Sequence, residues 1–194
     1  DVYKRQVDQF QDAHHKVAMS SLSLFGALLP LCLHIFEAYV EKFCPPLFLR
    51  MVDSKEQIRR MASEILVTVG ERYSVETLIP ALTRSLKTNK HPRSRIASLE
   101  FSVKYFRKST APSSSIVEGW IVLIGPLICE KVVEVRRAAA AALVRIYQSV
   151  DSKAVLSYIV SLPPRDQSMV RKAVHSFVDS IDEELASYAA SQNI

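Results

Sequence analysis

Three stretches of the chain place apolar residues at offsets of 0, 3, 4, 7, 8 and 11, which is the spacing of one face of an α-helix. These stretches are residues 58–69, 135–146 and 170–181. An arginine follows the first apolar residue of each: Arg59, Arg136 and Arg171. Three stripes with one register and one opening pair predict a repeated helical unit.

Two weaker copies of the stripe lie between and before the clear ones, around Arg95 and around Lys16. With them the marker positions are 16, 59, 95, 136 and 171, separated by steps of 43, 36, 41 and 35 residues. A period of this length is typical of two-helix HEAT repeats.

Each marked helix needs a partner, and three candidate first helices precede the marked ones at residues 37–52, 75–86 and 116–129. Each contains proline, which removes a main-chain hydrogen bond and bends a helix. Ser74 and the pair Ser114–Ser115 are expected to cap two of these helices. Residues 107–115, rich in serine, are expected to form a loop between repeats.

These patterns predict an all-α fold, an α-solenoid of about five HEAT repeats within a single domain over residues 1–194. The expected repeats span roughly 1–33, 34–73, 74–110, 111–150 and 151–194. Composition agrees, because only 4 of 194 residues are glycine and 48% are apolar. Sheet-rich folds need more glycine for their turns.

Residues 17–36 carry no formal charge over 20 positions, long enough to span a bilayer. Pro30 interrupts the run, so we interpret it as a buried helix followed by a turn into the next helix, with a membrane span as the alternative. The chain begins at Asp1 and not at Met. We therefore expect it to be part of a longer protein.

Positive charge concentrates at the turns inside the repeats. The windows 12–16, 53–60, 87–95, 130–137 and 165–172 hold 14 Lys and Arg against 6 Asp and Glu, whereas the rest of the chain holds 11 against 14. Such an edge suits salt-sensitive contacts with an acidic protein surface. The structural alternative is that Arg59, Arg136 and Arg171 form a ladder with acidic side chains.

Catalytic and metal-binding patterns are not found, so we expect no enzyme activity, no cofactor and no metal. The four glycines are isolated, and the neighbours His14 and His15 would point apart on a helix. Trp120 falls on an apolar stripe and is expected in the core. Cys32, Cys44 and Cys129 are each surrounded by apolar residues and are expected to be buried, reduced thiols of a cytosolic or nuclear protein.

The stretch from residue 46 to 106, with MVDSKEQIRRMASEIL, YSVETLIPALTRSL and HPRSRIASLEFSVKYF, resembles the TOG-type HEAT array of the CLIP-associating proteins (CLASPs), including the plant type. The run from Trp120 through EKVVEVRRAAAAALVRIYQSVDSKAVLSYIVSLPPRDQ resembles the closing repeats of the same domains. The resemblance covers about residues 10–190.

This resemblance implies a microtubule-associated protein of the cytoplasm and cytoskeleton. Such a domain binds the tubulin heterodimer or the microtubule along its inner-turn edge and regulates microtubule dynamics, with roles in cell division. The first repeat of such an array, with its aromatic turn residue, is expected to be missing from this chain. The implied tubulin-binding residues are Lys16, Lys55, Arg59, Lys90, Arg93, Arg95, Lys131 and Arg136.

Two other protein classes would account for a basic HEAT array. A generic scaffold would bind a protein partner through the concave helix face, yet the helix faces here are apolar and rich in alanine. A nucleic-acid-binding protein would interleave aromatic residues with the basic ones, yet the five turn windows contain none. We therefore expect a monomeric domain that binds neither nucleic acid nor membrane, while other protein partners stay open.

Overall fold

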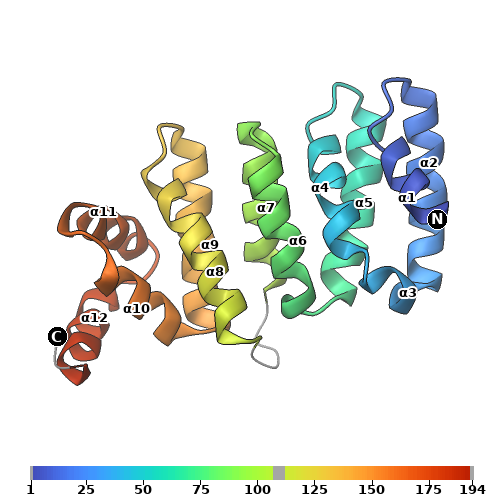
Figure 1. Cartoon of the computed structure of the whole chain (residues 1–194). Coiled ribbons are helices and arrows are strands. Elements are labelled where there is room, and N and C mark those ends of the chain that lie inside the picture. Colours follow the sequence, from blue (N-terminus) through green and yellow to red (C-terminus); the bar gives the residue numbers. More distant parts are fainter. Residues whose placement is uncertain (1, 107–111, 193–194) are drawn as a thin grey trace. The chain divides into compact units, whose positions relative to one another are not determined.

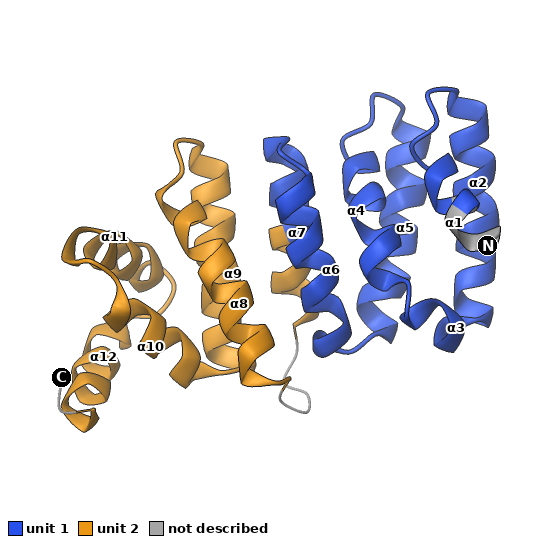
Figure 2. Ribbon diagram, in the orientation of Figure 1, with its two compact units in different colours: residues 1–98 blue, residues 99–194 orange. Residues whose placement is uncertain are grey.

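The computed structural model describes residues 2–106 and 112–192, and within them the chain is helical with short connections and without strands (Figure 1). It divides into two compact units, residues 1–98 and 99–194, with the boundary inside helix α7, Pro92–Tyr105 (Figure 2). The other elements of unit 1 are α1 Val2–Gln9, α2 His15–Leu28, η1 Leu29–Leu31, α3 Leu33–Glu37, α4 Val40–Arg50, α5 Glu56–Arg72 and α6 Val75–Thr88. Those of unit 2 are α8 Ser114–Ile124, η2 Gly125–Cys129, α9 Val133–Ser149, α10 Ser152–Ser161, α11 Pro164–His175 and α12 Ile181–Ser191.

Four phenylalanines form the core at the start of unit 1. The ring of Phe25 in α2 makes edge-to-face contacts with Phe10, Phe36 and Phe43, at centroid distances of 5.1, 5.1 and 5.0 Å. All four side chains are buried. Because such pairs contribute about 0.5–1.5 kcal/mol each beyond burial of their area, this cluster holds α2, α3 and α4 together.

The two long stripes are buried as their periodicity predicts, except for Met61 in α5, which is partly buried. In α5, Ile58, Ala62, Ile65, Leu66 and Val69 are all buried, and in α9 the whole stripe from Val135 to Ile146 is buried. Within unit 1, α5 packs on α2 and α4; within unit 2, α9 packs on η2, α10 and α11. The paired-helix organisation expected from the sequence is therefore present in both units.

The buried face of α7 is partly polar, because serine stands at positions where the stripes of α5 and α9 have apolar residues. Ser94 and Ser98 are fully buried in unit 1. The Ser94 hydroxyl donates to the Phe48 carbonyl at 3.2 Å, and the Ser98 and Ser85 hydroxyls share a hydrogen bond of 2.9 Å. These bonds satisfy groups that would otherwise be costly to bury, so a helix with few apolar residues still packs closely.

The prolines act in two ways. Pro45, Pro46 and Pro80 lie inside the α-helices α4 and α6, as predicted. Pro30 instead lies in η1, between α2 and α3, which confirms a turn in the apolar run 17–36. In the part of the chain that the structure describes, every helix is too short or too polar to cross a membrane.

The predicted helix 116–129 is wrong at both ends. The α-helix begins at Ser114, after an N-cap at Ser113, and ends at Ile124. Residues 125–129 form a 3₁₀ turn, because Pro126 has no N–H to continue the α-helical ladder. Ser74, by contrast, is confirmed as a cap, since its side chain accepts the Thr77 N–H. Of the predicted loop 107–115, residues 107–111 lie outside the described residues.

The third stripe, predicted as one helix over 170–181, is also wrong. Helix α11 ends at His175, and the chain turns before α12 begins at Ile181. Val170, Val174 and Ile181 are buried, but the Phe177 side chain is 43% exposed. The turn lets α12 pack on both α10 and α11, burying Ile181 and Leu185, which a straight continuation of α11 could not do.

Candidate functional site

Three turns inside the repeats lie at the same end of the helices of unit 1 (Figure 1). They connect α1 to α2, α4 to α5, and α6 to α7. We call their basic residues the basic turn surface of unit 1: Lys16, Lys55, Arg59, Lys90, Arg93 and Arg95. In unit 2, Lys131 and Arg136 occupy the turn from η2 to α9 and the first turns of α9.

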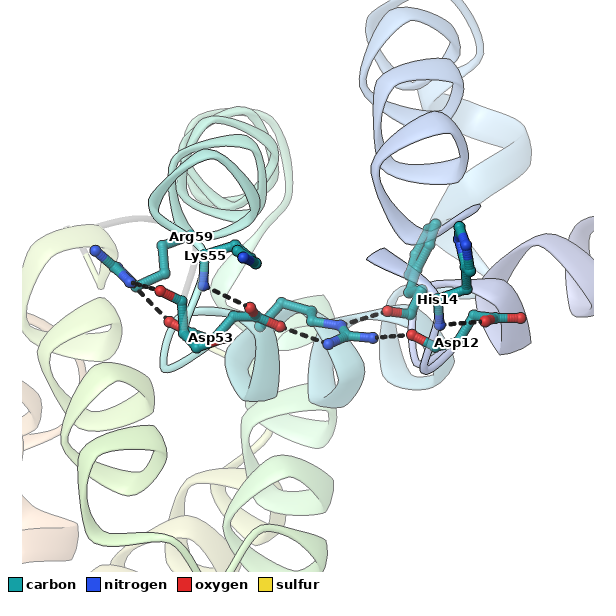
Figure 3. A network of polar contacts seen from close by, with 8 residues as sticks. Asp12, His14, Asp53, Lys55 and Arg59 are labelled. Atoms are coloured by element: carbon teal, nitrogen blue, oxygen red, sulfur yellow. Dashed lines mark hydrogen bonds and ion pairs between the residues drawn. The ribbon is translucent and has the colours of Figure 1, made fainter. Parts of the chain in front are cut away.

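Two of these turns share one local design. The Asp12 carboxylate accepts the His14 N–H at 2.7 Å, and the Asp53 carboxylate accepts the Lys55 N–H at 2.8 Å. Aspartate often closes a turn in this way, through the N–H two residues further on. His14 and Lys55 are the N-cap residues of α2 and α5, so each bond orients the chain as it enters the helix (Figure 3).

Arg50, which sequence analysis did not single out, connects these two turns. From the last turn of α4, its Nε donates to the Phe10 carbonyl at 2.5 Å and its Nη2 to the Asp12 carbonyl at 2.9 Å. Its Nη1 forms an ion pair of 2.5 Å with Asp53. The sequence contains one local signal, the Arg-x-x-Asp spacing, but contacts with residues about 40 positions earlier leave no local signature.

The environment of Asp53 favours its charged form. Burial by itself raises the pKa of this carboxyl, but hydrogen bonds from the Lys55 N–H and from Arg50, with the positive charge of Arg50, lower it below its ordinary value. Only 16% of the Arg50 side chain and 11% of the Asp53 side chain are exposed. This pair therefore makes the second turn a rigid part of unit 1.

Three arginines brace the turns that precede them. Each is the fourth residue of its helix: Arg59 in α5, Arg95 in α7 and Arg136 in α9. Each side chain donates a hydrogen bond to the main-chain carbonyl six residues earlier. The acceptors are Asp53 at 2.8 Å, Asn89 at 3.4 Å and Glu130 at 2.9 Å. Arg59 and Arg136 also donate to the carbonyls of Ser54 and Lys131, both at 3.0 Å.

An acidic ladder was the structural alternative for Arg59, Arg136 and Arg171. Among the residues that the structure describes, Arg171 is the one of the three with an acidic partner, Asp182, at 2.7 Å. For Arg59 and Arg136, the acceptors of the bonds just described are main-chain carbonyls. These two side chains are partly buried. Their guanidinium groups therefore hold the shape of the turns, while part of each stays accessible to a partner.

The register assigned to the first and last repeats is wrong. Lys16 lies two residues after the N-cap of α2, and Arg171 lies eight residues after the N-cap of α11. Arg59 lies four residues after the N-cap of α5. The residue four positions after the N-cap is Ala18 in α2 and Gln167 in α11. Apolar positions that recur every three or four residues fit more than one alignment, so the stripe alone could not choose between them.

The remaining predicted site residues have exposed side chains. Lys16, Lys55, Lys90 and Arg93 in unit 1, and Lys131 in unit 2, have exposed side chains. Within the described ranges 2–106 and 112–192, no ion pair neutralises any of them. Their charge is therefore available to a partner, unlike that of Arg50.

Several candidate chemical groups have structural explanations. Trp120 is fully buried in unit 2, as expected. His14 and His15 do not point apart but stack, with ring centroids 5.5 Å apart, because His14 precedes the helix. Cys44 is buried, Cys32 is partly buried, and Cys129 is exposed, which corrects the expectation that all three are buried. Burial raises the pKa of Cys44. The described residues contain no cluster suited to a metal ion.

Comparison with known proteins defines the class of this fold. Residues 25–189 match the family model for HEAT repeats of the stalled ribosome sensor GCN1-like type. Because the match extends over most of the chain, the chain belongs to this HEAT-repeat family.

The other comparisons narrow the resemblance within the HEAT-repeat proteins. CLIP-associated protein from Arabidopsis thaliana is 33% identical over 98% of this chain, which spans 14% of that relative's length. A structure reported for microtubule plus-end tracking by XMAP215, CLIP-170 and EB1 superposes with a TM-score of 0.67 at 16% identity, covering 90% of this chain and 74% of that one. The MAST/Orbit N-terminal domain superposes with a TM-score of 0.64 at 24% identity, covering 90% and 78%.

These relatives confirm the all-α HEAT fold and the predicted resemblance to the TOG-type domains of the CLIP-associated proteins.

Proposed function

We propose that this domain binds tubulin or the microtubule lattice through the basic turn surface of unit 1, and thereby regulates microtubule dynamics. In unit 2, Lys131 and Arg136 contribute a second group of contacts. The proposal depends on exposed basic side chains on three turns at one end of unit 1, for which no ion pair is found among the described residues: Lys16, Lys55, Lys90 and Arg93. The CLIP-associated relative and the plus-end-tracking neighbour support microtubules as the partner.

The braced turns suit this role. Arg50, Arg59 and Arg95 hold the main chain of the turns through hydrogen bonds. Lys55, Lys90 and Arg93 then project charge from a fixed frame, which lowers the conformational entropy lost on binding. Exposed charges of one sign accelerate association with an acidic surface, and salt weakens the interaction.

The proposal assigns a non-enzymatic role to a monomeric domain of the cytoskeleton, without a part in nucleic-acid or membrane binding. A scaffold that uses the concave helix face would bind its partner independently of the turns. Charge reversal at the turns therefore separates the two functions.

Co-sedimentation with microtubules at rising salt tests the proposal. The charge-reversal variant combines Lys55→Glu, Lys90→Glu and Arg93→Glu. We expect it to bind at least ~10-fold more weakly than the original chain at low salt, and both to weaken as salt rises. Binding that is absent at low salt, or unchanged in this variant, would contradict the proposal.

A matched control variant reverses three basic residues outside the turns: Lys42→Glu, Arg72→Glu and Lys153→Glu. All three side chains are exposed. The control changes net charge by the same amount as the turn variant, so we expect it to keep most of the binding. An equal loss in both variants would show that binding depends on net charge alone and not on the turns.

A further inference from the structure

Unit 2 contains a groove that shares only one of its described lining residues, Arg136, with the proposed tubulin contacts. It has a volume of about 780 Å³ and lies between the η2–α9 segment and helix α11. This volume is within the range of sites that hold small ligands or peptide side chains. Its lining combines exposed apolar side chains, which favour apolar groups on a ligand, with basic side chains, which favour negative charge.

The apolar part of the lining is unusually exposed. Val133 is 59% exposed, Met169 40% and Phe177 43%. Phe177 reaches the groove because α11 ends at His175, so this ring lies outside the buried stripe that its sequence spacing predicts. Large apolar side chains that gather around one depression are typical of a binding surface.

The basic part of the lining is Arg137 and Lys172. Both side chains are exposed, and neither forms an ion pair with a residue in the described part of unit 2. Arg136 also lines the groove, but it donates to the turn carbonyls of Glu130 and Lys131. Among the described residues that line the groove, Glu130 is the one acidic side chain against three basic ones, so this lining carries net positive charge.

We propose that this groove binds an acidic peptide segment of a partner protein, with one or two large apolar side chains as anchors. The apolar anchors would bury Val133, Met169 and Phe177, while Asp or Glu residues beside them would pair with Arg137 and Lys172. Burial of apolar area supplies affinity, and charge complementarity supplies selectivity. This inference does not depend on the proposed tubulin contacts of unit 1.

Fluorescence anisotropy with three labelled synthetic peptides tests the chemistry. The first is a 12-residue peptide with Leu and Phe among Glu and Asp, the second replaces the acidic residues by Lys, and the third replaces Leu and Phe by Ala. We expect the first to bind this chain at least ~10-fold more tightly than either of the others, and to weaken as salt rises. Equal affinities, or no binding of the first peptide, would overturn the proposal.

Two variants locate the binding in the groove. Arg137→Glu with Lys172→Glu, and Met169→Ala with Phe177→Ala, should each weaken the first peptide at least ~10-fold. All four side chains are exposed, so the fold should be preserved, which circular dichroism can verify. The variant with Lys55→Glu and Lys90→Glu should bind the peptide normally. Full peptide binding by both groove variants would place the site elsewhere and overturn the proposal.

Two further measurements separate this inference from the proposed function and from other ligands. The variant with Met169→Ala and Phe177→Ala should co-sediment with microtubules as the original chain does. Failure of the peptide proposal can therefore be observed separately from failure of the microtubule proposal. Anionic phosphatidylserine vesicles and a single-stranded oligothymidine serve as competitors. Displacement of the acidic peptide by either at lower concentration than by unlabelled peptide would contradict a peptide site.

Discussion

The guanidinium of Arg50 donates a hydrogen bond to the main-chain carbonyl of Phe10, which lies 40 residues earlier in the sequence. The same group pairs with Asp53, so one side chain connects two successive turns of unit 1. Lys16 follows the first of these turns and Lys55 lies in the second. The shape of the proposed binding surface therefore depends on a residue that is not part of it.

Substitution Arg50→Ala should lower the free energy of unfolding by about 2–4 kcal/mol, because it leaves Asp53 partly buried without its partner and two carbonyls without a donor. Urea denaturation followed by circular dichroism measures this loss. Arg60→Ala is the control, since Arg60 pairs with Glu64 on an exposed helix face. The control should cost no more than about 0.5 kcal/mol. Equal effects of the two substitutions would contradict the role of Arg50.

The Arg50–Asp53 pair should also make stability depend on pH. Because the pKa of Asp53 is lower in the folded state than its ordinary value near 3.8, the pair's contribution is present above that value and is lost as pH falls through the folded pKa. The urea midpoint of the original chain should therefore fall more steeply from about pH 5 to pH 3 than that of Asp53→Asn. Parallel curves for Asp53→Asn and the original chain would exclude this contribution.

Neighbouring basic residues of one turn should separate into stabilising and binding roles. Arg59→Ala removes two hydrogen bonds to turn carbonyls and should lower stability by about 1–2 kcal/mol. Lys55→Ala leaves its main-chain hydrogen bond intact and should change stability by less than about 0.5 kcal/mol while weakening microtubule co-sedimentation. Thermal or urea unfolding, compared with sedimentation of the same variants, checks both. A stability loss at Lys55 equal to that at Arg59 would refute the division.

Two glycines of unit 2 should respond in opposite directions to alanine. A Cβ at Gly125 would overlap the ring and hydroxyl of Tyr158, so Gly125→Ala should cost about 1–3 kcal/mol through displacement of that side chain. Gly119 lies inside α8, and a Cβ there meets nothing within 4 Å. Gly119→Ala should therefore stabilise the chain by up to about 1 kcal/mol. Denaturation midpoints measure both, and a neutral Gly125→Ala would show that Tyr158 moves away freely.

Local periodicity was sufficient to predict much of this fold. The stripes of α5 and α9, the cap at Ser74 and the turn at Pro30 depend on residues within a few positions of one another, so the sequence contains the information directly. The basic residues of the turns were predicted for the same reason. The alignment of Lys16 and Arg171 with Arg59 could not be settled, because a helical stripe fits several registers and only the turn geometry distinguishes them.

The sequence by itself determined the helices, their apolar faces and the positive charge of the turns, since each depends on local spacing and composition. Only the tertiary structure decided which distant carbonyls Arg50 binds, where α11 ends, and that Phe177 stays exposed in the groove that Lys172 also lines. These features depend on how helices pack within each unit. Helix packing brings together groups distant in sequence, and local periodicity does not record those distances.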